Sequence, residues 1–463
     1  MNKNNDVVTI YNIGKTGVKS VTKFKVNDDG TLGKKVSSGE KTIRYAKENA
    51  KTILPHGGCV PYAVFNGGCN DNLVSIAASG GGKTRSVVEP NIISEVGSMV
   101  ISDPKGYLYG KYASKLKADG YGIIHLDFIH AAKSMGYNPF EYIHSYEDVL
   151  KIATMITYLE RNVFTTADPF WDKAAVLLLS SLIGYLYEGG SQAHKNFYGV
   201  TKLLSSFDTD AIENGKKCAI DRIFEAHNIR FKEQHGGEPS WAYEQYQKFL
   251  GLGRKTLSCV IMTIQADLGR LDVPEIRKMT EKDEINISSI GQKKTAVFVE
   301  VSDTDRSKDL LVNIFYSQAM SVLCDYADSL ESHRLPVPVR FILDDFGTTS
   351  KIEGFDNMIS NIRSRGISAM LMIQSIAQLK KYYDISYQTI LNNCDTTIYL
   401  GGSNYETAQY IAQLVNKTPS TVLSMPMKKC WIFRRGGHKQ LADIVDIDYY
   451  TQRRRENEIT NEI

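Results

Sequence analysis

A glycine-rich segment between an apolar run and a helix-forming stretch constrains the fold of this chain most strongly. The apolar run covers residues 73–78, and three glycines at 80–82 directly precede Lys83 and Thr84. Strand, glycine loop and helix in this order are the context that a phosphate-binding P-loop requires. Glycines let backbone N–H groups turn toward an anion, and the helix N-terminus adds partial positive charge. The segment predicts a nucleotide-binding α/β fold.

The residue types in this loop have distinct expected roles. Lys83 would reach the β- and γ-phosphates of ATP, and the Thr84 hydroxyl would bind Mg²⁺. In the pattern G-x-x-x-x-G-K-[ST] the first glycine falls at Ala77, which fits if this position does not need a positive φ. The alternative interpretation is a glycine-rich turn that happens to precede a lysine. The expected nucleotide cradle consists of Ser79, Gly80, Gly81, Gly82, Lys83 and Thr84.

The composition is that of an ordinary globular protein with a mild positive charge. The 463 residues include 42% hydrophobic and 23% charged side chains, with a net charge of +3. This length gives room for about two to four domains. The charge permits a nucleic-acid partner without arguing for one. Seven cysteines with no C-x-x-C pair argue against disulfides and structural zinc, and they favour a reducing cytosol.

The sequence shows neither a secretory signal nor a membrane span. The first residues lack an apolar core, and the longest apolar stretch covers 174–187. A bilayer crossing takes about 20 residues, so a buried helix is the better interpretation of this stretch.

The order of the expected elements predicts an α/β domain interrupted by a helical module. Strand-like runs alternate with helical patterns on either side of residues 145–275, where the strand signal disappears. The expected strands are 73–78, 98–102, 122–126, 295–301, 339–343, 368–373 and 396–400. The expected helices are 108–118, 147–160, 172–188, 198–206, 211–228, 240–268, 308–330, 352–363, 375–391 and 404–416.

These elements define the expected domains. Residues 1–70 are a small N-terminal extension, with a strand-rich part over 1–45 and loop over 46–70. The nucleotide-binding domain is expected in two parts, 71–145 and 276–450, on either side of an all-α domain over 146–275. A polar tail covers 451–463.

A second apolar run ends in two carboxylates, Asp344 and Asp345. A P-loop ATPase needs a carboxylate at a strand end for the Mg²⁺ shell, and a neighbouring one to orient the attacking water. Asp344 fits the first role and Asp345 the second. Most such ATPases have Glu in the second role, so Asp345 reaches one methylene less far, which puts the rate of hydrolysis in question. The alternative interpretation is a surface turn.

Two further groups complete the expected catalytic set. Gln374 stands at the end of another expected strand, where a glutamine can sense the γ-phosphate. Arg363 and Arg365 precede that strand, and a guanidinium there could act as an arginine finger. The alternative is that both arginines solvate a helix C-terminus, where cations are favourable.

Taken together, these blocks resemble the type IV coupling proteins, the RecA-like DNA-pumping ATPases of conjugation and type IV secretion. The Asp-Pro-Lys-Gly block at 103–106 is far more specific than a bare P-loop. The resemblance covers about residues 72–445. Its matching blocks are 77–84, 89–91, 102–106, 137–140, 168–171, 343–347, 374–379, 393–395 and 399–401.

The resemblance implies a RecA-like P-loop nucleotide-binding domain with an inserted all-α domain, and ATP and Mg²⁺ as ligands. It implies a homo-oligomeric ring, hexameric on assembly, with ATP at subunit interfaces and Arg363 favoured over Arg365 as the finger. The implied partners are single-stranded DNA, a relaxase and type IV secretion channel components at the membrane. Lys105 lies beside the expected phosphate site, and no chemical step is assigned to it.

Family members usually begin with two membrane-spanning helices, and this sequence shows none. Either the chain belongs to the subset that lacks this anchor, or the anchor was removed. We expect the first, a cytoplasmic protein that a partner recruits to the inner face of the membrane.

Three functions are open at this point. The first is an ATP-hydrolysing coupling protein that recruits a relaxase–DNA complex and pumps DNA into the channel. The second is a nucleotide-binding recruitment adaptor with weak or no hydrolysis. The third is a secretion ATPase that acts on protein only. Stimulation of hydrolysis by DNA would favour the first.

Overall fold

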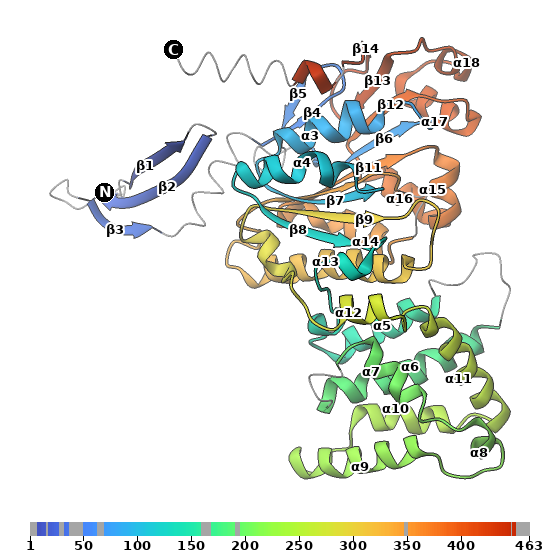
Figure 1. Cartoon of the computed structure of the whole chain (residues 1–463). Helices are drawn as coiled ribbons and strands as arrows, with labels where there is room; N and C mark the ends of the chain where they lie inside the picture. The colour runs from blue at the N-terminus through green and yellow to red at the C-terminus, as the bar shows by residue number, and fades with distance from the viewer. Residues whose placement is uncertain are drawn as a thin grey trace.

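The computed structural model describes residues 7–14, 17–26, 32–36, 50–62, 69–158, 168–189, 195–346, 351–445 and 447–450, the first three ranges by their backbone alone. Its architecture confirms the predicted α/β class with an all-α module (Figure 1).

A nine-stranded sheet forms the centre of the α/β part (Figure 1). Its order is β14-β13-β12-β6-β11-β10-β7-β9-β8, and the seven strands from β12 to β8 pair in parallel. Parallel neighbours end at the same edge of a sheet, so β6, β11, β10 and β7 bring their carboxyl ends together. The bounds are β6 (Leu73–Ala77), β7 (Ser98–Pro104), β8 (Gly122–Asp127), β9 (Thr295–Val301), β10 (Val339–Leu343), β11 (Ile367–Ile373), β12 (Thr396–Gly401), β13 (Lys429–Arg434) and β14 (Gln440–Asp443).

Helices cover both faces of this sheet because its buried strands carry apolar side chains on both sides. In β6, Leu73 and Ala77 join one apolar cluster, while Val74 and Ile76 join the other. The first cluster contains side chains of α3 (Glu89–Ser94) and α4 (Tyr107–Ala118). The second contains those of α13 (Asp309–Ser329), α14 (Phe355–Asn361), α15 (Ile376–Tyr383), α16 (Tyr387–Asn392) and α17 (Tyr405–Val415).

The helical module lies between β8 and β9 in the sequence and below the sheet in Figure 1. Its core is continuous with the apolar cluster on the α13 face of the sheet. The module contains α5 (Tyr146–Tyr158), α6 (Pro169–Gly189), α7 (Phe197–Leu204), α8 (Thr209–Glu213), α9 (Ala219–Gln234), α10 (Trp241–Leu250), α11 (Arg254–Gly269) and α12 (Pro274–Thr280).

Three expected helices are wrong because each is broken in two. The helix over 211–228 is α8 and α9, separated by a turn in which Gly215 has φ +70°. The helix over 240–268 is α10 and α11, with Gly251 and Gly253 between them. The helix over 375–391 is interrupted at Asp384, which has φ +43°. A left-handed residue or a glycine disfavours continuation of a helix, which explains each break.

Short elements outside the main pattern also differ from expectation. The expected loop over 46–70 contains a hairpin of β4 (Lys51–Ile53) and β5 (Cys59–Pro61). The sequence pattern missed β13, β14 and α18 (Pro419–Leu423). The expected strand-rich segment contains β1 (Val7–Gly14), β2 (Gly17–Val26) and β3 (Leu32–Val36). The expected polar tail lies outside the described residues.

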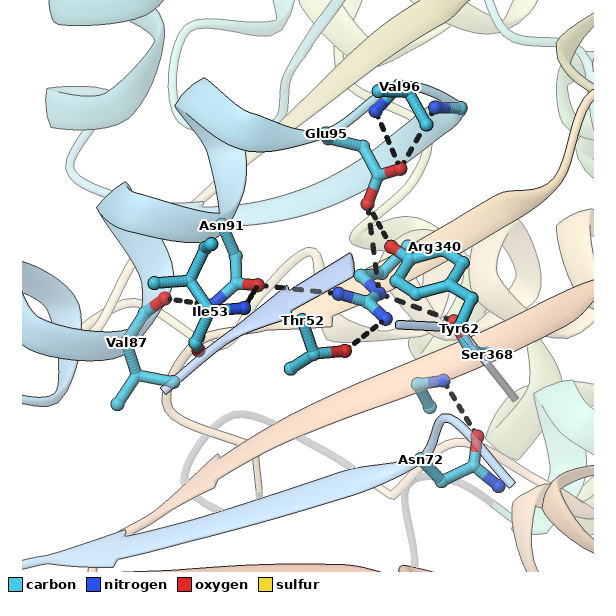
Figure 2. A network of polar contacts seen from close by, with 12 residues as sticks. Thr52, Ile53, Tyr62, Asn72, Val87, Asn91, Glu95, Val96, Arg340 and Ser368 are labelled. Carbon is cyan, nitrogen blue, oxygen red and sulfur yellow. Dashed lines mark hydrogen bonds and ion pairs between the residues drawn. The ribbon is translucent and has the colours of Figure 1, made fainter. Parts of the chain in front are cut away.

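A buried arginine fastens the hairpin to the sheet (Figure 2). Arg340, in β10, is 1% exposed, and its Nη2 donates to Thr52 Oγ1 of β4 at 2.9 Å. Its guanidinium lies 4.1 Å from the centre of the Tyr62 ring and its Nε lies 3.8 Å from Glu95 Oε2. Glu95 directly follows α3, and a buried charge is tolerated only when it is paired in this way. The network therefore joins the hairpin, β10 and the end of α3.

None of the helices in the described part of the chain combines the length and the apolar character that a membrane crossing requires.

Candidate functional site

The loop after β6 needs all three of its glycines. Gly80 and Gly82 have φ +73° and +85°, a region that side-chain-bearing residues rarely adopt. A Cβ at Gly81 would lie 2.8 Å from the Cβ of Ala77, closer than two carbons approach. The helical turn η1 (Thr84–Val88) follows directly and continues into α3.

Ala77 stands where the P-loop pattern has its first glycine, and alanine fits there only if φ is not positive. It is absent from the described non-glycine residues with positive φ, so alanine fits its backbone conformation. Its carbonyl oxygen accepts a hydrogen bond from Lys83 Nζ at 2.8 Å. Lys83 is 7% exposed, and this burial lowers the pKa of its ammonium. The negative charges of Asp345 and Asp344 act in the opposite direction and raise that pKa. The ammonium is thus held under the loop, close to both carboxylates.

Thr84 and Asp344 come together from the loop and from the acidic strand end. Thr84 Oγ1 donates to Asp344 Oδ2 at 2.8 Å, and the Asp345 backbone N–H donates to Asp344 Oδ1 at 3.1 Å. Asp344 is 6% exposed, and burial raises its pKa to about 6. Carboxylate and hydroxyl oxygens are the ligands that Mg²⁺ prefers, so this donor pair fits a magnesium ion.

Asp345 follows Asp344 in a strained conformation. Its φ of +54° is left-handed, which costs an L-residue about 1–2 kcal/mol. Strain of this kind persists where the surroundings enforce it, and it concentrates at functional sites. The carboxylate acts electrostatically on Lys83, so Asp345 belongs to the same site. Its expected role in orienting water stays a prediction.

Gln374 directly follows β11, which lies between β6 and β10 in the sheet. The end of this strand therefore lies at the edge that carries the P-loop and Asp344. The Gln374 side chain is half-buried, and its Oε1 accepts a hydrogen bond from Gln378 Nε2 at 3.3 Å.

The two candidate finger arginines lie at the opposite edge of the sheet. Both belong to the turn η6 (Ile362–Arg365), which precedes β11. A seven-residue strand spans about 20 Å, so the structure does not bring Arg363 to the P-loop of its own chain. Arg365 forms a two-point ion pair with Asp328, at 2.8 Å from Nε and 2.6 Å from Nη2. Arg363 is exposed.

The Asp-Pro-Lys-Gly block is a turn held by buried contacts. The Asp103 carboxylate accepts hydrogen bonds from the backbone N–H groups of Leu108 and Tyr109 at 2.9 and 2.6 Å, and so caps α4. Burial raises the pKa of Asp103, and these two hydrogen bonds oppose the rise. Gly106 has φ +69°, which side-chain-bearing residues rarely adopt, and a Cβ there would also push the Glu300 carboxylate aside from a distance of 2.6 Å, so this position favours glycine.

Glu89 is a site-supporting residue whose role the sequence pattern did not predict. It is fully buried, and it accepts hydrogen bonds from Lys111 Nζ and Tyr112 Oη, both at 2.5 Å, and from Tyr107 Oη at 3.2 Å. These donors belong to α4, so Glu89 ties the helix after the P-loop to the helix that Asp103 caps. The sequence signal for Glu89 was its position in the block 89–91 that resembles the family. Its hydrogen-bond partners lie about twenty residues further along the chain, so that signal did not show them.

The sequence matches a known protein family and several of its characterised relatives. The sequence profile of the family described as "Type IV secretory system Conjugative DNA transfer" matches residues 25–425. Protein VirD4 of Agrobacterium fabrum (strain C58) is 24% identical over 364 residues, which cover 73% of this chain and 48% of VirD4. A conjugal transfer protein TraG of Escherichia coli is 21% identical over 369 residues, covering 75% and 55%. The chain thus spans about half the length of these relatives.

The fold is similar to that of a solved structure, the plasmid coupling protein TrwB in complex with ADP and Mg²⁺. The TM-score is 0.62 at 16% identity, over 89% of this chain and 93% of TrwB. At this identity the likeness shows a shared RecA-like P-loop fold with an all-α domain.

The raised pKa of Asp344 predicts how a substitution changes stability with pH. Because the pKa lies at about 6 instead of 3.8, folding favours the protonated carboxyl. This contribution is fully present below about pH 4 and is lost as the pH rises through 6. Without divalent cations, Asp344→Asn should therefore be more stable than wild type at pH 8, by up to about 3 kcal/mol.

Urea unfolding of both proteins at pH 8 and pH 4 measures this difference. The difference in the free energy of unfolding between Asp344→Asn and wild type should disappear at pH 4. The exposed control Asp210→Asn should show no such pH-dependent difference. A lower stability of Asp344→Asn at pH 8 would show that the folded state does not disfavour this carboxylate.

Proposed function

Because the chain belongs to the type IV secretory system conjugative DNA transfer family, we propose that it is an ATP-hydrolysing coupling protein that pumps DNA into a secretion channel. One observation carries the enzymatic part: the 2.8 Å hydrogen bond between Thr84 and Asp344, which joins the P-loop and the acidic strand end into one site. The fold shared with TrwB, solved with ADP and Mg²⁺, supports the same ligands here.

The proposed chemistry assigns each side chain a place in phosphoryl transfer to water. Lys83 and the loop N–H groups bind the β- and γ-phosphates of ATP, and Thr84 and Asp344 hold Mg²⁺. The ion, when bound, neutralises charge on the phosphate oxygens. Asp345 orients the attacking water, and Gln374 contacts the γ-phosphate from its neighbouring strand end.

We propose that the active form is a homo-oligomeric ring of six subunits. The opposite-edge position of Arg363 supports this proposal, because an exposed guanidinium there is placed to act on the ATP of a neighbouring subunit and not on its own. Arg365, whose guanidinium pairs with Asp328, is the weaker candidate on the family's pattern.

The proposed partners follow from the family. They are single-stranded DNA, a relaxase and channel components at the membrane, and recruitment to the membrane is proposed to depend on a partner. We propose that the all-α domain over 146–275 contacts the relaxase–DNA complex, while the nucleotide-binding domain over 71–145 and 276–450 drives transfer.

Steady-state ATP hydrolysis with and without single-stranded DNA tests the proposed function. DNA should stimulate hydrolysis at low salt, and the stimulation should fade as salt screens the phosphate contacts. Lys83→Ala should lower the rate at least tenfold because it removes the ammonium that binds the β- and γ-phosphates. The exposed lysine variant Lys417→Ala, in the nucleotide-binding domain just after α17, is the matched control and should keep the wild-type rate.

Other outcomes of the same assay point elsewhere. Hydrolysis that ignores DNA at low salt would favour a secretion ATPase for proteins. An absence of turnover together with capture of a relaxase would favour the recruitment adaptor. A wild-type rate in Lys83→Ala would contradict the site itself.

Mixing two inactive variants tests the role of Arg363 across subunits. Arg363→Ala and Lys83→Ala should each hydrolyse ATP at least tenfold more slowly than wild type. Mixed rings should recover activity, because some interfaces combine the intact P-loop of one variant with the intact arginine of the other. A mixture that stays inactive, although rings form by mass measurement, would remove Arg363 from this role.

A further inference from the structure

Lys105 occupies a backbone conformation that lysine rarely adopts. It has φ +75°, and Gly106 after it has φ +69°, so two consecutive left-handed residues directly follow β7. Asp345, two residues after the end of the neighbouring strand β10, is another such residue, with φ +54°. Ser102 pairs with Leu343 in the register of these parallel strands, so Lys105 and Asp345 follow adjacent strand ends.

Buried contacts on both sides of Lys105 fix this conformation. Asp103, two residues earlier, is held by its hydrogen bonds to the first turn of α4. Gly106, the next residue, packs its backbone against the Glu300 carboxylate. The backbone N–H of Gly106 also donates to the Asp103 carbonyl oxygen at 3.3 Å, so Lys105 is the second central residue of a hydrogen-bonded turn, the position at which a type II turn requires a positive φ.

The ion pair that Lys105 makes does not explain why a lysine stands there. Its Nζ lies 2.9 Å from Asp303 Oδ2, but the two side chains are 71% and 46% exposed. Exposed ion pairs contribute little to stability, whereas glycine or asparagine would adopt this conformation with less strain. The hydrogen bond to Asp303 and the charge of that carboxylate raise the pKa of the Lys105 ammonium, and the charge of Asp345 adds a weaker effect in the same direction.

We propose that Lys105 is a positioning residue for ATP hydrolysis, which Asp303 holds at the carboxyl edge of the sheet so that its ammonium orients the Asp345 carboxylate toward the attacking water. This inference rests on the proposed function, because it needs a reaction in which Asp345 takes part. It explains why the turn keeps a lysine at the cost of backbone strain.

Substitutions at Lys105 separate this role from a structural one. Lys105→Asn removes the charge and suits the left-handed backbone, so the melting temperature should not fall. Its kcat should fall about tenfold, as for loss of an orienting contact, while KM for ATP stays near wild type because Lys83 still binds the phosphates. Lys105→Arg keeps the charge and should restore at least a third of the wild-type kcat.

The matched control is Lys428, an exposed lysine with φ +63° that directly precedes β13. In the sheet, β13 lies five positions from β7. Lys428→Asn relieves the same kind of strain and should leave both kcat and KM unchanged.

A double substitution tests the part of Asp303. Asp303→Asn should lower kcat about threefold in the wild-type background, because the ammonium is no longer held in place. Asp303→Asn should have no effect in the Lys105→Asn background, because no ammonium remains there for Asp303 to hold.

These steady-state measurements have three informative outcomes. If wild type hydrolyses ATP and Lys105→Asn matches its kcat, or if Lys105→Arg fails to restore it, the inference is wrong while the proposed function stands. An equal effect of Asp303→Asn in both backgrounds would likewise overturn the role of Asp303. If wild type does not hydrolyse ATP with or without DNA, the proposed function fails and the inference falls with it.

Discussion

The parallel pairing of β6, β11, β10 and β7 is the constraint on which the site depends. Because these neighbours end at one edge, residues separated by up to about 300 positions meet there. The P-loop, Gln374, Asp344 and the Asp-Pro-Lys-Gly turn each follow one of the four strands. The same topology sends Arg363, which precedes β11, to the opposite edge. The Arg363 guanidinium therefore lies about one strand length, roughly 20 Å, from the P-loop of its own chain.

Buried polar contacts then fasten the strand ends and helices around this edge. Glu89 ties the helix after the P-loop to α4, and Asp103 caps the first turn of α4. Arg340 anchors the β4–β5 hairpin and Glu95 at the far end of α3. In a low-dielectric interior such groups hold geometry because each would be costly to leave unpaired. The strained residues Asp345 and Lys105 persist within this rigid frame.

The parts that sequence predicted well are those with local signals. Apolar runs marked the central parallel strands, and glycine spacing marked the P-loop, since backbone conformation there depends on the residues themselves. Short or interrupted elements escaped, as at the helix break between Gly251 and Gly253, where periodicity continues across the break. Contacts that depend on tertiary pairing also escaped, including Arg340 with Thr52 and Lys105 with Asp303. A local sequence pattern does not indicate a contact partner that lies hundreds of residues away.

Equilibrium binding of a fluorescent ATP analogue, with and without Mg²⁺, tests most directly whether the loop and the acidic strand end form one magnesium–nucleotide site. Wild type should bind the analogue at least tenfold more tightly with Mg²⁺ if Thr84 and Asp344 supply the ion's protein ligands as proposed. In Asp344→Asn this gain should vanish while weak binding through Lys83 remains. Equal affinity with and without Mg²⁺ in wild type, or an undiminished gain in Asp344→Asn, would contradict the site described here.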